Sequence, residues 1–143
     1  MKLATLIHGK SHEIVKIKDN QSIAEAAIAL TEHKIGALLV ESQDGQIAGI
    51  LSERDIVGGM APHGADLHDV EVSELMTTNV IRCSPDDSVN EAMAMMTDRR
   101  IRHLPVVSNG KLAGIVSIGD VVKLRLGEIE QEADAMRAYI AGN

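Results

Sequence analysis

A seven-residue pattern occurs twice in this chain, as Gly49-Ile50-Leu51-Ser52-Glu53-Arg54-Asp55 and as Gly114-Ile115-Val116-Ser117-Ile118-Gly119-Asp120. Each copy contains a glycine, two aliphatic residues, a serine and, three residues after the serine, an aspartate. The copies begin 65 residues apart in a chain of 143 residues. Self-similarity at this distance indicates that one supersecondary unit has been duplicated.

The residues around the two copies predict the same order of elements in both halves. In the first half we expect a strand at 13–18, a helix from Ser22 to about His33, strands at 37–40 and 47–51, and a helix that Ser52 opens and Gly58-Gly59 end. In the second half we expect a strand at 80–83, a helix from Ser88, two strands joined by an Asn109-Gly110 hairpin, and a final helix. The predicted fold class is α/β (α+β), built from two β-α-β-β-α repeats.

Capping signals support this alignment of the two halves. Ser22 is followed three residues later by Glu25, and Ser88 is followed in the same way by Glu91. In such a capping box the hydroxyl accepts a backbone N–H bond and the carboxylate reaches back to the first residue. We therefore predict a capping box at the start of each of these helices.

The remaining segments complete the predicted organisation. Residues 1–13 form a lead-in with a short helix or turn that packs on the body. Residues 14–60 form the first repeat, 61–71 a linker, and 72–126 the second repeat, which a short helix at 72–76 introduces. Residues 127–143 extend the last helix.

The extended helix carries apolar residues at coiled-coil spacing. Their separations alternate between four and three residues, and we call this set the α-helical seam: Val122, Leu126, Ile129, Ala133, Met136 and Ile140. The seam is shorter than three to four heptads, and Gly127 weakens the helix by up to about 1 kcal/mol. Two interpretations stay open, a helix docked on its own domain and a contact between two copies of the chain.

Composition excludes several function classes. The net charge of −7 argues against nucleic acid, and the chain has a single aromatic residue, Tyr139. A single cysteine, Cys83, fits a reducing compartment, where we expect it to pack as a small apolar residue rather than react. No apolar run approaches the length of a membrane span, so we expect a cytoplasmic protein.

Metal binding and catalysis are also disfavoured. Four histidines invite a metal interpretation, but they form no compact ligand cluster with cysteine or carboxylates: His8, His12, His63 and His68. The sequence contains neither a paired nucleophile and base nor a Gly-rich phosphate loop. We therefore expect no metal and no enzymatic activity.

The doubled units, together with Arg102-His103-Leu104-Pro105-Val106-Val107 before the second hairpin, resemble a tandem pair of CBS domains of the small stand-alone type. The resemblance covers roughly residues 14–126. It implies two repeats packed as a pseudo-twofold pair, with clefts that bind AMP, ADP, ATP, S-adenosylmethionine or NAD. It also implies a homodimer that regulates another, unidentified protein.

The resemblance also implies roles for individual residues. Asp55 and Asp120 would accept the ribose hydroxyls, while Ser52 and Ser117 would lie near the phosphate. Arg102, His103 and Arg54 would face phosphate, although each has the alternative of being a solvated surface residue. The adenine wall would come from aliphatic residues, several of which are equally explained as plain core: Ile17, Leu38, Leu39, Val80, Ile81, Leu104 and Pro105.

The serine–aspartate pairs have a purely structural alternative as well. Ser followed three residues later by an acid is itself a helix-capping pattern. A helix N-terminus also offers N–H groups and a partial positive charge to a phosphate, and the two roles are compatible. The leading hypothesis is thus a non-catalytic sensor of an adenine nucleotide, AMP or NAD. The alternative is a structural interaction module that works through its C-terminal helix.

Overall fold

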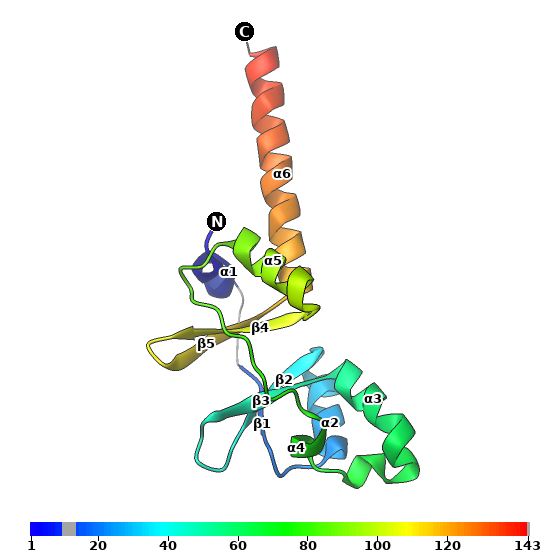
Figure 1. Ribbon diagram of the computed structural model, residues 1–143. Helices are drawn as coiled ribbons and strands as arrows, with labels where there is room; N and C mark the ends of the chain where they lie inside the picture. Colours follow the sequence, from blue (N-terminus) through cyan, green and yellow to red (C-terminus); the bar gives the residue numbers. More distant parts are fainter. Residues whose placement is uncertain (10–13, 143) are drawn as a thin grey trace. The chain divides into compact units, whose positions relative to one another are not determined.

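The structure is a computed structural model that describes residues 1–9 and 14–142 (Figure 1). The chain divides into two compact units. The first-repeat unit comprises Glu13–Val80, and the second-repeat unit combines Met1–His12 with Ile81–Asn143. Each unit is treated by itself below.

The first-repeat unit has a three-stranded sheet in the order β1-β2-β3, with β1 parallel and β3 antiparallel to the central β2. Its elements are β1 (Lys16–Lys18), α2 (Ile23–His33), β2 (Ala37–Glu41), β3 (Ile47–Ser52), α3 (Glu53–His63), the 3-10 helix η1 (Gly64–Asp69) and α4 (Val72–Leu75). The apolar face of α2 and one face of the sheet form the core with α4: Ile17, Ile23, Ala26, Leu30, Leu38, Val40, Leu51 and Val72.

The second-repeat unit has a two-stranded antiparallel sheet. Its elements are α1 (Leu3–Gly9), α5 (Val89–Arg99), β4 (His103–Ser108), β5 (Lys111–Ser117) and α6 (Ile118–Ala141). The core repeats that of the first unit: Leu3, Leu6, Cys83, Val89, Ala92, Met96, Leu104, Val106, Val116 and Val121. The predicted mixed helix-and-strand fold with duplicated units and a C-terminal helix is therefore confirmed.

The strand predicted at 80–83 is wrong, because only Cys83 pairs with the sheet. Cys83 makes an isolated parallel bridge to Val106, just as Ile17 pairs with Val40 in the first unit. At the next residue the chain turns, since the Ser84 N–H donates to the Asp87 carboxylate at 2.8 Å and Pro85 has no N–H. As predicted, Cys83 is a core residue, 4% exposed.

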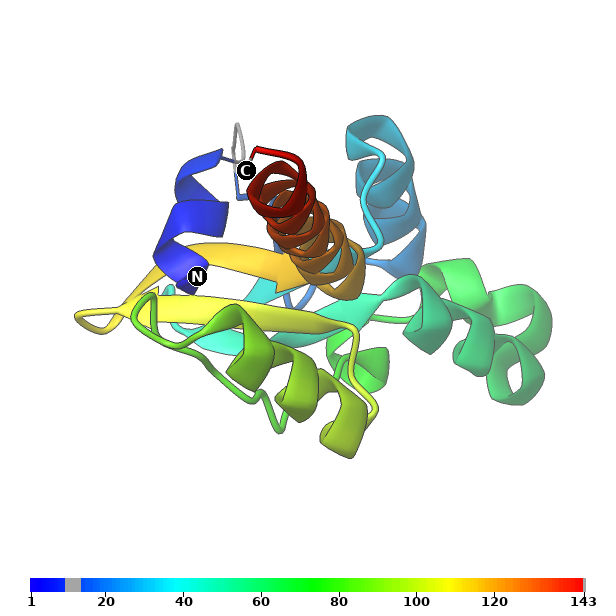
Figure 2. The same ribbon diagram turned by 90° about the horizontal axis from the view of Figure 1, so that it is seen from above.

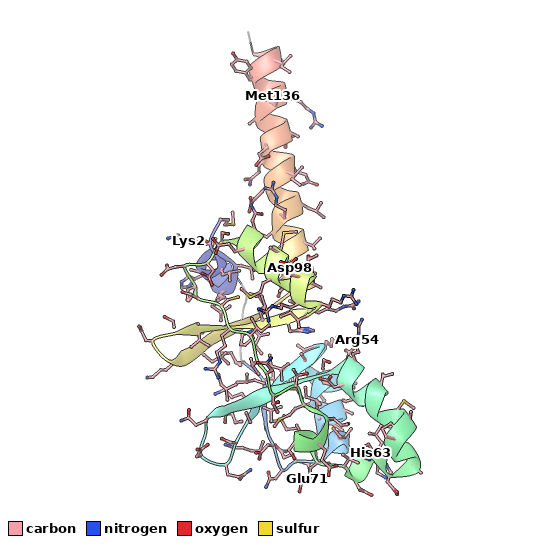
Figure 3. All side chains as sticks on the ribbon, in the orientation of Figure 1. Lys2, Arg54, His63, Glu71, Asp98 and Met136 are labelled. Atoms are coloured by element: carbon pink, nitrogen blue, oxygen red, sulfur yellow. The ribbon has the colours of Figure 1, made fainter. Side chains whose placement is uncertain are left out.

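Each lead-in segment packs on the repeat that it does not directly precede in the sequence. In the second-repeat unit Lys2 bridges Ser88, and the Leu3 N–H donates to the Asp87 carbonyl at 2.9 Å. In the first-repeat unit Glu71 bridges Ser22, and the Val72 N–H donates to the Gln21 carbonyl at 2.8 Å. Figure 3 labels Lys2 beside α1 and Glu71 beside α4. The short helix predicted at 72–76 exists, but its contacts are with the first repeat.

The helix predicted to stop at Gly58-Gly59 continues to His63. Gly59 is buried, and a Cβ there would lie 2.6 Å from Leu75 Cδ1 and 2.9 Å from Leu67 Cδ1. This glycine therefore permits close packing and does not end the helix. The segment predicted as a linker, 61–71, holds the end of α3 and all of η1, and Leu67 packs against the core of the first-repeat unit.

Helix α6 starts on the second-repeat core and then leaves it. Val121 is fully buried and Leu124 packs against the core. Beyond them the helix extends past α1 and α5 (Figure 1), and Figure 2 shows it nearly end-on. Four seam residues are 46–72% exposed: Leu126, Ile129, Met136 and Ile140. Within the described residues, docking along its own unit is therefore wrong for this part of α6. The described helices include none long and apolar enough to cross a membrane.

Candidate functional site

The first serine–aspartate pair lies where β3 ends and α3 begins. The Asp55 N–H donates to Ser52 Oγ at 3.2 Å, and the Ser52 N–H donates to Asp55 Oδ2 at 2.9 Å. Ser52 is thus the N-cap of α3 in a complete capping box. A carboxylate has two oxygens with about four acceptor sites in total, so this bond uses part of the Asp55 capacity.

The second pair has the same geometry at the junction of β5 and α6. The Asp120 N–H donates to Ser117 Oγ at 3.1 Å, and the Ser117 N–H donates to Asp120 Oδ2 at 2.9 Å. The backbone of both serines is extended, with ψ of 163°. The structure therefore shows the capping role in both copies and presents a carboxylate at the same place in each repeat.

The two boxes predicted with glutamate differ from each other. Ser88 and Glu91 form a complete box, with a 3.4 Å bond from the Ser88 N–H to Glu91. At the other helix the Glu25 N–H donates to Ser22 Oγ at 3.1 Å, but the Glu25 carboxylate accepts from the Gln21 side-chain amide at 2.6 Å. The predicted N-cap at Ser22 is therefore confirmed, but the Glu25 carboxylate is shared between the Gln21 amide and the Ser22 hydroxyl, from which it accepts at 3.3 Å.

Few first-turn N–H groups are left for a phosphate. The Glu53 N–H donates to the Gly36 carbonyl at 3.0 Å, and the Ile118 N–H donates to the Arg102 carbonyl at 2.8 Å. With the serine hydroxyls accepting at the third helical residue, two of the first three N–H groups of each helix are already bonded. The expectation that the helix N-termini offer free N–H groups to a phosphate is therefore corrected. Charged side chains would have to supply most of the attraction for an anion.

The second repeat gathers its polar candidates at one end of the β4–β5 hairpin. His103 is the register partner of Ser117 across the sheet, and the Arg102 carbonyl is bonded to the first residue of α6. Arg102 is exposed, while His103, Ser117 and Asp120 are half-buried. A cation, an imidazole, a hydroxyl and a carboxylate thus come from three neighbouring segments.

The first repeat has a different cation at the corresponding place. Gly36 and Ala37 occupy the positions of Arg102 and His103, and Ala37 is the register partner of Ser52. The nearby basic residue is Arg54, exposed on the first turn of α3 (Figure 3). The two polar clusters lie in different units and carry different basic residues, Arg54 in one and Arg102 with His103 in the other.

The expected apolar wall divides into core and non-core residues. Ile17, Leu38 and Leu104 are 4%, 0% and 0% exposed within the cores of their own units, which favours the plain-core alternative for them. Pro105 is the register partner of Ile115 and alternates with the core residues of β4, so it faces the other side of its sheet. Val80 and Ile81 are half-buried.

Sequence reasoning missed the polar residues on the outer face of the first sheet. Lys16 and Lys18 flank the buried Ile17 on β1 and form ion pairs with Glu41 at 2.9 Å and 3.2 Å. The bonds from Lys16, together with Lys18, lower the pKa of the Glu41 carboxyl. The alternation of lysine and isoleucine over 16–18 is the signal that identifies this second, polar face.

Among the described residues no three His, Cys, Asp or Glu side chains converge as metal ligands. His8, His63 and His68 are described, whereas His12 lies outside the described residues. No metal chemistry is assigned to the clusters above.

The comparisons with known proteins agree with this geometry. The CBS domain model matches residues 10–61 and 72–127. A CBS-domain protein of Agrobacterium tumefaciens, ATU1752, is 45% identical with a TM-score of 0.83, and the match covers 87% of this chain and 92% of that one. The CBS domain-containing protein CBSX3, mitochondrial, of Arabidopsis thaliana is 36% identical over 127 residues, which cover 86% of this chain and 62% of that protein.

A third relative was solved with bound ligands. The CBS domain pair of protein MJ0100 was solved in complex with 5′-methylthioadenosine and S-adenosyl-L-methionine. It is 28% identical to this chain with a TM-score of 0.77, and the match covers 90% of this chain and 98% of that one. Proteins of this type are generally regulatory modules rather than enzymes. Since the CBS domain model matches two repeats that together span most of the chain, this chain belongs to the CBS domain family, as a tandem pair.

Proposed function

We propose that this chain is a non-catalytic sensor that binds an adenine nucleotide, AMP or NAD, and thereby regulates a separate protein in the cytoplasm. One observation carries the proposal: Arg102, His103, Ser117 and Asp120 come together at one end of β4–β5. The adenosine ligands of the MJ0100 pair add support, since that protein matches almost this whole chain.

In this proposal the aspartates recognise the ribose. A carboxylate accepts hydrogen bonds from both ribose hydroxyls, as the acidic residue of dinucleotide-binding folds does. The capping bond holds Asp120 Oδ2 at 2.9 Å from the Ser117 N–H, which orients the carboxylate before a ligand arrives. Asp55 is oriented in the same way by Ser52. A preorganised acceptor loses little side-chain entropy on binding.

The cations recognise the phosphate. Arg102 offers a fork of N–H donors that matches phosphate oxygens, and His103 and Ser117 add donors beside it. Arg54 has this role in the first repeat. Since the helix N-terminal N–H groups are largely bonded, these side chains determine the phosphate affinity. The second-repeat cluster carries more donors and should bind the anionic ligand more tightly.

The adenine ring would lie on aliphatic surface, because the chain has no aromatic residue apart from Tyr139. The proposal keeps as contacts Pro105, which is buried on the other face of its sheet, and the half-buried Val80 and Ile81. Ile17, Leu38 and Leu104 would support the site from within the core.

Calorimetric titration of the full chain with AMP, ATP, NAD and NADH tests the proposal. We expect saturable binding of at least one ligand and a higher melting temperature in its presence, because a ligand that binds only the folded state stabilises it. Arg102→Ala should weaken AMP binding more than adenosine binding. Absence of both heat and thermal shift with all four ligands would contradict the proposal.

The second candidate function is an interaction module that works through α6. The exposed part of the seam favours it, because Leu126, Met136 and Ile140 present apolar surface on an isolated helix. Removing residues 128–143 distinguishes the two functions. A sensor keeps its nucleotide affinity after this truncation, whereas a module of the second kind loses its only binding surface.

A further inference from the structure

Beyond Glu128, the described residues of α6 are exposed apart from Ala133, which is half-buried. Met136 lies on the portion that extends past α1 and α5 (Figure 3). The whole helix has 24 residues, about 36 Å at 1.5 Å per residue. Most of the stability of a helix in a protein comes from packing of its apolar face, so a partner that covers the exposed seam residues would stabilise the C-terminal half of α6.

The chemistry of the seam specifies what kind of partner fits. In heptad positions a to g, Leu126, Ala133 and Ile140 take position a, and Val122, Ile129 and Met136 take position d. Positions a and d form the core of a coiled coil. Every seam residue except Ala133 is at least 40% exposed, so the surface is available along the whole seam.

We propose that α6 pairs with α6 of a second copy of this chain as a parallel, in-register, two-stranded coiled coil. The flanking charges select this partner and this orientation. In a parallel pair a residue at g lies next to the following e residue of the partner helix. Arg125 then lies beside Glu130 of the second copy, and Glu132 beside Arg137 of the second copy. Both pairs are of opposite charge, and symmetry doubles them.

An antiparallel pair with the same overlap places like charges together. In that arrangement e residues face e residues and g residues face g residues. Glu130 would oppose Glu130 of the second copy, and Lys123 would oppose Arg137. Such contacts are repulsive, and e and g charges set orientation in coiled coils. The surface is therefore complementary to itself only in the parallel arrangement.

This inference does not depend on nucleotide binding. It concerns residues 122–140, whereas the proposed ligand contacts on α6 end at Asp120. Loss of one property by mutation leaves the other measurable in the same protein.

Sedimentation of the full chain over a concentration series tests the pairing. Met136→Asp should raise the dimer dissociation constant at least about tenfold, since it removes from each helix a methionine that the proposed dimer would bury. Ala138→Asp is the matched control, because Ala138 lies at position f on the opposite side of the same turn. We expect it to change the dissociation constant less than threefold.

Cross-linking tests the orientation. Met136→Cys should form an intermolecular disulfide under mild oxidation, since a d residue meets its own copy in a parallel, in-register pair. Ala138→Cys should not. The native Cys83 is buried and does not compete. A chain that is monomeric at all concentrations overturns the proposal. So does a dimer that Met136→Asp leaves intact, or a Met136→Cys variant that cross-links no better than Ala138→Cys.

Discussion

Asp120 has a role in folding and a second role in the proposed ligand site, and mutation separates the two. Asp120→Ala removes the carboxylate that accepts the Ser117 N–H bond, so stability should fall by about 0.3–1.5 kcal/mol. Glu91→Ala removes the equivalent bond at α5 and should cost a similar amount. Urea denaturation measures both variants. Only Asp120→Ala should weaken nucleotide binding; equal affinities for the two variants would exclude Asp120 from the ligand site.

Two glycines at matching positions should tolerate alanine very differently. A Cβ on Gly49 would lie 2.5 Å from the Thr77 carbonyl oxygen, which is backbone and cannot move aside. On Gly114 it would lie 3.4 Å from side-chain atoms of Ile7. We expect Gly49→Ala to cost about 1–3 kcal/mol and Gly114→Ala less than about 1 kcal/mol, measured by urea denaturation. A reversed order would show that the lead-in contacts differ from those described.

Glu41 should contribute to the acid sensitivity of the first-repeat unit. Hydrogen bonds from Lys16 and Lys18 lower the pKa of its carboxyl in the folded state below the usual value for glutamate. The stabilisation is therefore fully present above about pH 4.5 and is lost as the pH falls through the folded-state pKa. Wild type should lose more stability than Glu41→Gln between pH 6 and pH 3 in urea titrations. Glu32→Gln, at an exposed glutamate, controls for removal of one carboxylate.

At the scale of elements, the lead-in helices are as important to the cores as the repeats themselves. Leu3 on α1 and Val72 on α4 occupy equivalent positions, and both are fully buried. Leu3→Ala should cost about 2–5 kcal/mol. Hydrogen exchange should show the loss of protection in α5, β4 and β5 for Leu3→Ala, but in α2 and β2 for Val72→Ala. Loss in the sequence-adjacent repeat instead would contradict the crossed arrangement.

The elements also show where sequence reasoning succeeds and where it stops. The spacing of apolar residues and the chemistry of helix caps and turns are local properties of the sequence. Residues such as Ser88 and Asn109 therefore predict α2, α5, the hairpins and the full length of α6. The end of α3 was not predictable, because Gly59 is explained by contacts with Leu67 and Leu75, which are distant from it in sequence. The extent of the strand around Cys83 was not predictable either, because it depends on pairing with β4, where only Cys83 bonds to Pro105 and Val107.

The candidate site was predictable to a similar degree. The repetition of Ser52-x-x-Asp55 as Ser117-x-x-Asp120 identified the positions, and the capping bonds follow from local geometry. The bond from the Ile118 N–H to the Arg102 carbonyl joins residues far apart in sequence, so no local pattern reveals that this N–H group is already bonded. Leu104 and Pro105 are both buried, and the strand alternation places them on opposite faces of their sheet.

For the whole molecule, the crossed lead-ins mean that the sequence repeats are not independent folding units. Cutting between residues 71 and 72 removes Val72 from the first-repeat core and leaves α1 on the wrong fragment. We expect fragments 1–71 and 72–143 to melt without cooperativity when separate, as followed by circular dichroism, and to recover a cooperative transition when mixed. Fragment 13–80, which keeps α4, should be more stable than 13–71; equal melts would contradict this.

Both ends of the chain belong to the same compact unit, the second-repeat unit. The first-repeat unit is a continuous insertion within the second-repeat unit, which holds both α1 and α6. A domain fused at either end of this chain would therefore be anchored to the same half. The first-repeat unit is joined to the second-repeat unit by two peptide connections, at 12–13 and 80–81. It would have no direct covalent connection to a fused domain. A conformational change that begins in the first-repeat unit would therefore reach a fused domain along the chain only through the second-repeat unit.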